Sequence, residues 1–389
     1  MIIMIRSRSL AMCAVAASAA QLMFAALAPS ASAVAGTAAT SSTAGSSTPA
    51  ARAGFSSGRC GPAAVALGYS DALDKLVYNG VELGGLSDLA YDARSGSWVS
   101  SVDNHGTDPS RLWFYRDLAD PTVTRDPLVL KKPDGTPYDG TTADNEGLAV
   151  LPDGDFMVSS ETEPSVRIYG RDGVQKASLP IPARFAVTGT TPAGEATSNV
   201  TLEGLTVAPS GRQIIAAMEG PLSGDVSGTD TTAHRFLVYD LTRSGNWTLT
   251  RQIGYRTDAG MRVPEVQSYR NGALLVEEAS FSAAVGNAVK LYAVTGTDSA
   301  YDVSSVPNLA SAPAKDFVSQ NKELIADLVT CPTLGAPSRQ IQTNPLLDNY
   351  EGMAVTPIAG PISQVTLISD DNFGATQFTR VLRLGALLP

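Results

Sequence analysis

The chain has 389 residues, of which 17% are charged and 43% hydrophobic, and its formal net charge is −10. That length allows one large domain or two ordinary ones. The excess of acids and the lack of any Lys/Arg run argue against nucleic acids and anionic membrane surfaces as partners.

The first 33 residues predict a signal peptide. Arg6 and Arg8 precede an apolar stretch at 10–27, and the small residues at 31–33 fit a cleavage site. This stretch is short for a membrane span, and no later stretch approaches the roughly 20 apolar residues that a span needs. We therefore expect a secreted, extracellular protein without a membrane span. Cleavage removes two arginines and no acids, which changes the net charge from −10 to −12.

Residues 34–58 are rich in Ala, Ser, Thr and Gly, a composition typical of a flexible lead-in. Residues 59–389 are then expected to form the folded domain. Two cysteines remain after cleavage, Cys60 and Cys331, and an even pair in an exported protein indicates a disulfide. The alternative is two buried free thiols.

A hairpin pattern recurs five times, and each copy begins and ends with an acid. Between the two acids lie short apolar runs and a central turn signal such as Pro152-Asp153-Gly154. Because an antiparallel hairpin places mirror-related residues side by side, each repeat should bring two carboxylates together at its open end. The pairs are Asp88 and Asp103, Glu146 and Glu161, Glu203 and Glu219, Glu265 and Glu278, and Glu351 and Asp370.

The spacing of the repeats predicts the fold class. Their first acids are separated by 58, 57, 62 and 86 residues, and further strand-like segments follow each hairpin. Four short strands per repeat predict an all-β protein, a β-propeller of five or six four-stranded blades. The sixth blade would be assembled from residues 63–83 and 381–388. Within the longest interval, apolar residues at near-helical spacing predict one short helical insertion at 313–328.

If the blades are arranged in a ring, the acids should converge on one mouth. Clustered carboxylates suit Ca²⁺, which prefers six to eight oxygen ligands, and without a cation they would raise one another's pKa. The candidate metal ligands are Glu146, Glu203, Glu351, Asp370 and Asp371. The alternative for any single acid is a structural role, in which it caps backbone amides or pairs with an arginine.

Several other catalytic centres are not expected. With only two histidines a three-histidine zinc site is excluded, and no G-x-S-x-G motif indicates a serine esterase. A bound calcium could instead activate water against a phosphoester or polarise a lactone or ester carbonyl. Basic residues near the repeat ends, which otherwise would be ordinary strand or ion-pair residues, are candidates for holding an anionic substrate: Arg111, Arg167, Arg235 and Arg380.

The repeats resemble the phytase-like family, which is described as having the esterase-like activity of phytase. The resemblance covers residues 62–384 and lies in Gly85–Leu89 with Ser101–Asn104, Asn145–Val150, Leu202–Val207 with Ala217–Leu222, and Asn349–Ala354 with Ile368–Phe373. The sequence departs from the family in the fourth repeat. There the family usually has L-V-x-E-R, whereas this chain has Leu275-Val276-Glu277-Glu278-Ala279.

The resemblance implies a secreted propeller with phosphoester- or ester-hydrolase activity on a small anionic substrate. In this interpretation the five candidate ligands hold Ca²⁺ or position water, and Glu161 and Glu219 support them or act as general base. We expect a monomer. The alternatives are a calcium-dependent lactonase or esterase on a similar propeller, and a non-catalytic extracellular binding module with structural acids.

Overall fold

The computed structural model describes residues 58–103, 105–189 and 194–389. The predicted signal peptide, residues 34–57 of the lead-in and Asn104 lie outside the described residues. No helix in the described ranges is long and apolar enough to cross a membrane.

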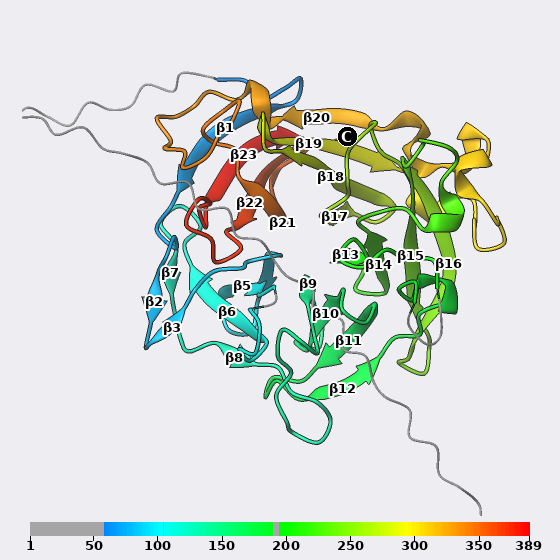
Figure 1. The fold of residues 1–389 in the computed structure, drawn as a ribbon, viewed down its shortest axis with the longest axis horizontal. Coiled ribbons are helices and arrows are strands. Elements are labelled where there is room, and N and C mark those ends of the chain that lie inside the picture. Colours follow the sequence, from blue (N-terminus) through cyan, green and yellow to red (C-terminus); the bar gives the residue numbers. More distant parts are fainter. Residues whose placement is uncertain (1–57, 104, 190–193) are drawn as a thin grey trace, which may run out of the picture. The chain divides into compact units, whose positions relative to one another are not determined.

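The described chain forms a five-bladed β-propeller, with the blades arranged around a central axis (Figure 1). Blade one consists of β4 (Ala90–Asp92), β5 (Ser97–Ser101), β6 (Arg111–Arg116), β7 (Thr122–Val123) and β8 (Leu128–Val129). Blade two consists of β9 (Asn145–Val150), β10 (Phe156–Ser160), β11 (Ser165–Tyr169) and β12 (Gln175–Ser178). Blade three consists of β13 (Leu202–Val207), β14 (Gln213–Met218), β15 (Ala233–Leu241) and β16 (Trp247–Arg256). Blade four consists of β17 (Val266–Arg270), β18 (Ala273–Ser282), β19 (Gly286–Thr295) and β20 (Glu323–Asp327).

Blade five is completed by both ends of the domain. Its inner strands β21 (Asn349–Ala359) and β22 (Ile362–Asp370) are followed by β23 (Val381–Leu387), and β1 (Ala64–Ser70) pairs with β23 from Ala64 opposite Ala386 to Ser70 opposite Val381. The expected pairing of the two ends is confirmed, but it completes the fifth blade and forms no sixth. The strands β2 (Val77–Tyr78) and β3 (Val81–Glu82) form a separate two-stranded ribbon.

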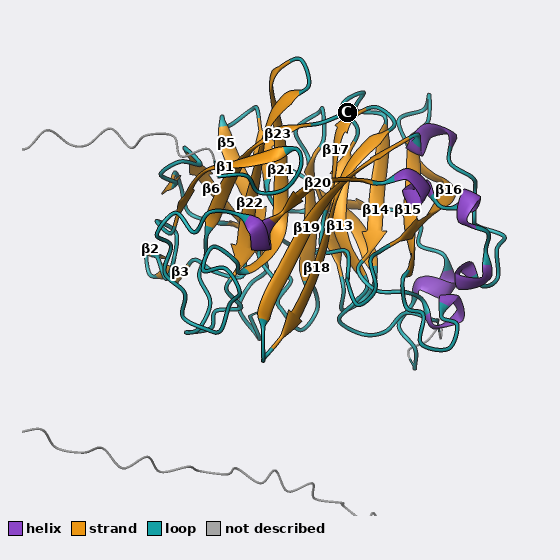
Figure 2. Ribbon diagram, turned by 90° about the horizontal axis from the view of Figure 1, so that it is seen from above, coloured by secondary structure: helices purple, strands orange, loops and turns teal. Residues whose placement is uncertain are grey.

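The predicted helix at 313–328 is wrong. The segment contains the 3-10 turns η5 (Ala314–Asp316) and η6 (Val318–Asn321), followed by β20 and then by η7 (Leu328–Thr330). β20 satisfies its backbone by pairing with β19, with Leu324 opposite Tyr292, so a sheet edge replaces the hydrogen bonds of a helix. The other short turns are η1 (Ala183–Phe185), η2 (Ser223–Asp225), η3 (Thr297–Ser299) and η4 (Leu309–Ser311). Several of them lie at the side of the domain near β16 in the view of Figure 2.

A disulfide joins Cys60 to Cys331 across 271 residues of sequence, as predicted. Both cysteines are buried in a core cluster that also contains residues of blades four and five, among them Leu291 and Leu384. The covalent link therefore holds the start of the domain to the segment that leads into the last blade.

The glycines of the repeated Glu-Gly pairs are required by close packing between neighbouring innermost strands. A Cβ at Gly147 would lie 2.4 Å from the carbonyl oxygen of Glu203, and one at Gly204 would lie 2.7 Å from the amide nitrogen of Val266. The same holds between blades five and one, where a Cβ at Gly352 would lie 2.7 Å from Cα of Asp88. These contacts bring the acids of adjacent blades together around the axis.

Candidate functional site

An acidic pocket of about 210 Å³ lies at one end of the central axis. Its acids lie near the start of the innermost strand of a blade or near the end of the strand that follows it. These two positions meet at the same end of the blade because the two strands form an antiparallel hairpin. The lining residues are Asp103, Glu146, Glu161, Asn199, Glu203, Glu219, Arg262, Asn349, Glu351, Asp370 and Asn372. Seven of these are acids, and together they come from four blades.

Two overlapping groups of three carboxylates have the spacing of a metal site. Asp103, Asp144 and Glu146 each place one oxygen within 4.8 Å of the others, and so do Glu146, Glu161 and Glu203. Glu146 belongs to both groups and therefore lies at the centre of the arrangement. Apart from Asp103, these side chains are buried, so their charges are poorly screened by water.

Burial and mutual repulsion raise the pKa values of these acids. Burial, and then the charge of Glu203, raise the pKa of Glu146 well above its usual value. Burial, and then Glu219, raise the pKa of Glu161 to about 8. Burial and the nearby Asp144 raise the pKa of Asp103 to about 11. Without a cation, several of these carboxyls would thus carry protons at neutral pH.

The donors fit a hard divalent cation. All the members of the two groups are carboxylates, the ligand type that Ca²⁺ and Mg²⁺ prefer. Glu203 is 5% exposed, and its buried Oε2 has no hydrogen-bond partner among the described residues. A buried carboxylate oxygen in this state is costly unless a proton or a cation satisfies it.

Arg262 neutralises the other side of the pocket. Its Nη1 pairs with Glu219, and its Nη2 donates to Oδ1 of Asn349 at 2.8 Å and to Oε1 of Glu351 at 3.2 Å. Burial alone would lower the pKa of this guanidinium, but Glu219, Glu351 and Glu203 raise it. The positive charge of Arg262 therefore serves one half of the pocket, and the carboxylates around Glu146 form the other half.

The backbone of Arg262 lies opposite Ala279, to which it is joined by two hydrogen bonds of 2.8 and 3.0 Å. Ala279 is the position at which the family resemblance led us to expect an arginine. In this chain the guanidinium in this region comes from the paired position on the neighbouring segment.

Three of the ten paired acids lie away from the pocket. Asp88 is buried, and its carboxylate accepts from the amides of Leu89 at 2.5 Å and of Leu148 in the next blade. Glu265 is also buried and accepts from the amide of Val266 at 2.8 Å. These two acids serve the backbone of neighbouring strands, the structural alternative considered above. Burial raises the pKa of Asp88 to about 8 despite these bonds.

The fourth hairpin has a different pairing from the expected one. The amide of Glu277, and not that of Glu278, donates to the carbonyl of Glu265, at 2.9 Å. Glu278 consequently faces the opposite side of the strand, where it accepts from the hydroxyl of Tyr255 and pairs with Lys322. A register shifted by one residue sends alternate side chains to opposite faces.

Asp371 is placed beside the pocket lining and not within it. Its oxygens accept from Lys75 and from the amides of Gly85, at 3.0 Å, and Phe373, at 3.1 Å. The neighbouring Asp370 lines the pocket and accepts from the amide of Asn372 at 2.7 Å. Of the five candidate ligands, the structure thus brings Glu146, Glu203, Glu351 and Asp370 together.

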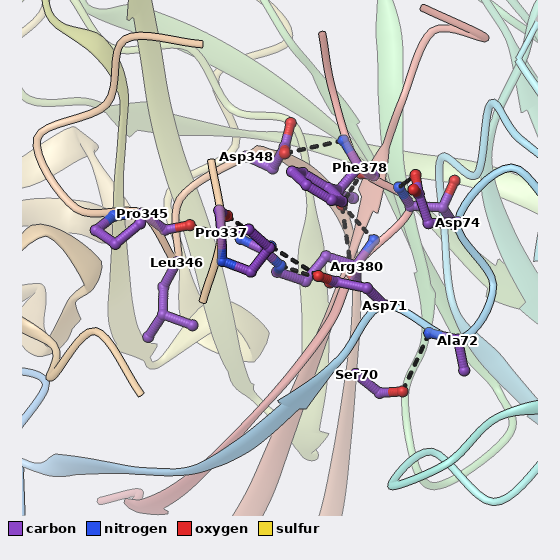
Figure 3. A network of polar contacts seen from close by, with 12 residues as sticks. Ser70, Asp71, Ala72, Asp74, Pro337, Pro345, Leu346, Asp348, Phe378 and Arg380 are labelled. Carbon is purple, nitrogen blue, oxygen red and sulfur yellow. Dashed lines mark hydrogen bonds and ion pairs between the residues drawn. The ribbon is translucent and has the colours of Figure 1, made fainter. Parts of the chain in front are cut away.

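The arginines that were candidates for substrate binding are not among the described residues that line the acidic pocket. Arg235 forms a buried bidentate pair with Asp225, at 2.6 and 2.8 Å. Arg380 forms a similar pair with Asp71, at 2.7 and 2.9 Å, inside the network of Figure 3. Arg111 is buried and donates to two backbone carbonyls. These contacts fit the ordinary ion-pair and strand roles given above as the alternative.

Sequence reasoning missed three members of the site, Asp144, Asn199 and Arg262, of which Asn199 lies in the turn that precedes β13. Asp144 directly precedes the Asn145-Glu146 pair, so its position next to a candidate ligand was a usable signal. Arg262 lies outside every repeat motif, and only its pairing with Ala279 brings it to the axis. No local pattern could have indicated it.

Comparison with known proteins identifies one matching family model, described as phytase-like, esterase-like activity of phytase, over residues 81–373. No curated protein matches the chain. Among solved structures, a protein of unknown function from Dyadobacter fermentans has 10% identity and a TM-score of 0.43, and the match covers 84% of this chain and 100% of that one.

Two solved gluconolactonases are also similar. The one from Xanthomonas campestris has 13% identity and a TM-score of 0.36, with 85% of this chain and 92% of that chain covered. The periplasmic one from Pseudomonas aeruginosa has 12% identity and a TM-score of 0.33, with 79% and 87% covered. At these scores the likenesses carry no argument about function.

Proposed function

This chain belongs to the phytase-like family, and from that premise and the acidic pocket we propose that it is a secreted hydrolase of small phosphoesters that uses a divalent cation, Ca²⁺ in the first instance. The observation that carries the proposal is the pair of overlapping carboxylate groups that share Glu146. The unpartnered buried oxygen of Glu203 supports it.

The ligands proposed for the cation are Asp103, Asp144, Glu146 and Glu203, with Glu351 and Asp370 on the adjoining wall. A divalent cation bound there would neutralise the carboxylates and polarise a phosphoryl oxygen. The cation is needed for any anionic substrate, because the described residues that line the pocket include seven acids and one arginine, which would otherwise repel a phosphate.

Glu161 is the better placed of the two proposed general bases. Its Oε1 accepts from the amide of Thr201, which fixes the side chain. Glu161 also belongs to the same set of three neighbouring carboxylates as Glu146 and Glu203. Glu219 is paired with Arg262, and its proposed part is to hold that guanidinium beside the substrate. A base must be ionised to accept a proton from water, and the cation would lower the pKa of Glu161 toward that state.

The first experiment measures phosphate release by the purified chain from residue 34 onward. The substrates are phytate and a simple aryl phosphate, with Ca²⁺ and then with chelator. We expect phosphate release that requires Ca²⁺. The rate should fall at least about 100-fold in Glu203→Gln, as is typical when a metal-binding or charge-stabilising group is removed from an active site. Calcium affinity, measured by calorimetry, should fall about 10- to 100-fold.

The matched control is Glu323→Gln, which removes an exposed carboxylate and should change neither quantity. Absence of phosphate release from folded, calcium-bound protein would reject the phosphoesterase proposal. Hydrolysis of a sugar lactone under the same conditions would then identify a calcium-dependent lactonase, whereas no turnover of either class would favour a binding module.

A further inference from the structure

A second cavity, of about 620 Å³, lies on the outer strands of blade two. It is formed by β11, β12 and the segment around η1, and it shares no lining residue with the acidic pocket. Its walls combine polar residues with apolar ones, which include Leu179, Ile181, Pro182 and Ala186. The volume falls in the range of small-molecule sites, which combine apolar walls with a few polar groups.

One of the residues that line this cavity is a buried arginine. Arg167 is 5% exposed, and its Nη1 has no hydrogen-bond partner within the described ranges. Its guanidinium lies 4.8 Å from the ring centre of Tyr138, another wall residue. The ion pair to Glu163 is long, at 3.6 Å, and the Glu163 side chain is 84% exposed, so this carboxylate offers a weak and well-solvated counter-ion.

Two other buried arginines of this chain are paired differently. Arg235 and Arg380 each bind one carboxylate through two short hydrogen bonds. Such pairing is what normally makes a buried guanidinium tolerable, since a buried charge without a close partner is costly. Arg167 therefore lacks the close carboxylate that these two arginines have.

Two neighbours on the same strand face also have unsatisfied polar atoms. Ser165, Arg167 and Tyr169 alternate along β11 and so share one face of the strand. The hydroxyl oxygens of Ser165 and Tyr169 are buried and have no hydrogen-bond partner in the described part of the chain. Burial raises the pKa of the Tyr169 phenol, and the nearby Arg167 opposes that rise. Ser165 lines the cavity together with Arg167.

We propose that this cavity binds a small organic acid, whose carboxylate pairs with the guanidinium of Arg167 and whose apolar body occupies the space between β12 and η1. The hydroxyl of Ser165 would donate a second hydrogen bond to the carboxylate. The site is separate from the acidic pocket and needs no metal.

The test uses octanoate as the probe and 1-octanol as its uncharged counterpart, both titrated calorimetrically into the whole domain in the presence of chelator. Octanoate should bind with a stoichiometry of one, and Arg167→Met should weaken it at least about tenfold, the loss expected for one charge-assisted hydrogen bond. The affinity for 1-octanol should be unchanged. Arg243→Met, which removes an exposed arginine, is the matched control and should leave octanoate binding intact.

A second variant keeps the arginine and fills the cavity. Ala186→Trp should abolish binding of both octanoate and 1-octanol, which separates occupation of this cavity from attraction to a positive charge elsewhere. Glu163→Gln removes the competing counter-ion and should strengthen octanoate binding about two- to fivefold. All variants are checked for folding by circular dichroism and thermal unfolding.

The proposal is overturned if octanoate does not bind the folded wild-type domain, or if Arg167→Met and wild type bind it equally. It is also overturned if Ala186→Trp binds it as tightly as wild type. Glu203→Gln, which tests the acidic pocket, should bind octanoate normally, so failure of one site can be distinguished from failure of the other.

Discussion

Among the described residues that line the acidic pocket, Arg262 is the one basic side chain. It contacts Glu219 and Glu351 and lies 3.6 Å from Glu203, so it stabilises two acids of blade three and one of blade five. Its side chain is 26% exposed, which moderates the strength of these pairs. The arginine therefore does for one half of the pocket what the proposed cation would do for the other.

Replacing Arg262 by Met should destabilise the metal-free domain, and more strongly at pH 8 than at pH 5. Burial raises the pKa of Glu351 and of Glu203, and loss of the arginine would raise both further. An acid with a raised folded-state pKa contributes stability at low pH that is lost as the pH rises through that pKa. We expect a loss of about 2 kcal/mol at pH 8, below the 3–5 kcal/mol of a fully buried pair.

The measurement is urea unfolding of wild type and Arg262→Met in chelator at both pH values. Arg243→Met serves again as the control for loss of a positive charge. An equal loss at pH 5 and pH 8 would show that the arginine acts through packing and not through the charges of these acids.

At the scale of the strands, the Glu-Gly repeats have a double role. The glutamate can face the pocket, as at Glu146 and Glu203, or accept backbone amides, as at Glu265. The glycine allows the next innermost strand to approach. Close packing of the innermost strands therefore explains why the Glu-Gly motif recurs. Its acids could bind a metal ion only where three or more of them converge.

Gly147→Ala should be strongly destabilising, because the added Cβ would lie 2.4 Å from the Glu203 carbonyl oxygen and 2.5 Å from Cβ of Leu205. Both atoms belong to a strand that cannot retreat without disturbing blade three. We expect a loss of about 2–3 kcal/mol, in the range of overpacked cores, together with weaker metal binding.

Gly385→Ala in β23 is the matched control, since its Cβ would make contacts no closer than 3.4 Å. Thermal and urea unfolding compare the two variants. A Gly147→Ala protein as stable as Gly385→Ala would contradict the close-packing explanation of the repeat.

At the scale of the whole propeller, the ring is closed in two ways. The strand from the start of the domain completes blade five, and the disulfide joins Cys60 to Cys331. Both links connect segments that are distant in sequence, so both oppose the opening of the ring between its first and last parts.

Replacing both cysteines by serine should lower the free energy of unfolding by about 2–5 kcal/mol, as is typical for a disulfide that closes a long loop. Urea unfolding with and without dithiothreitol measures the effect. The reductant should bring wild type to the midpoint of the double variant and leave the double variant unchanged. If the fully reduced wild type unfolded at the same midpoint as the oxidised protein, the closure of the ring would be assigned to strand pairing alone.

The sequence by itself determined the fold class, the five hairpins, the disulfide and most of the pocket acids. The fold class, the hairpins and the pocket acids depend on local alternation, on turn residues or on a short repeat, which neighbouring residues in the chain decide. The disulfide followed from the even number of cysteines in an exported protein. The pairing of the two chain ends was also predictable, whereas their place in blade five was not, because the number of blades depends on how all the blades pack together.

Only the tertiary structure decided which acids share the pocket. Glu265 is paired with Glu277 and not with Glu278, the residue expected from the symmetry of the hairpin. This shift of one residue turns the Glu278 side chain away from the pocket. Arg262 reaches the pocket because its segment pairs with the strand that contains Ala279. Arg167 is left without a close carboxylate because of the way the segments around β11 pack in space. Charge pairing is a property of distances in space, and the linear order of the residues does not contain those distances.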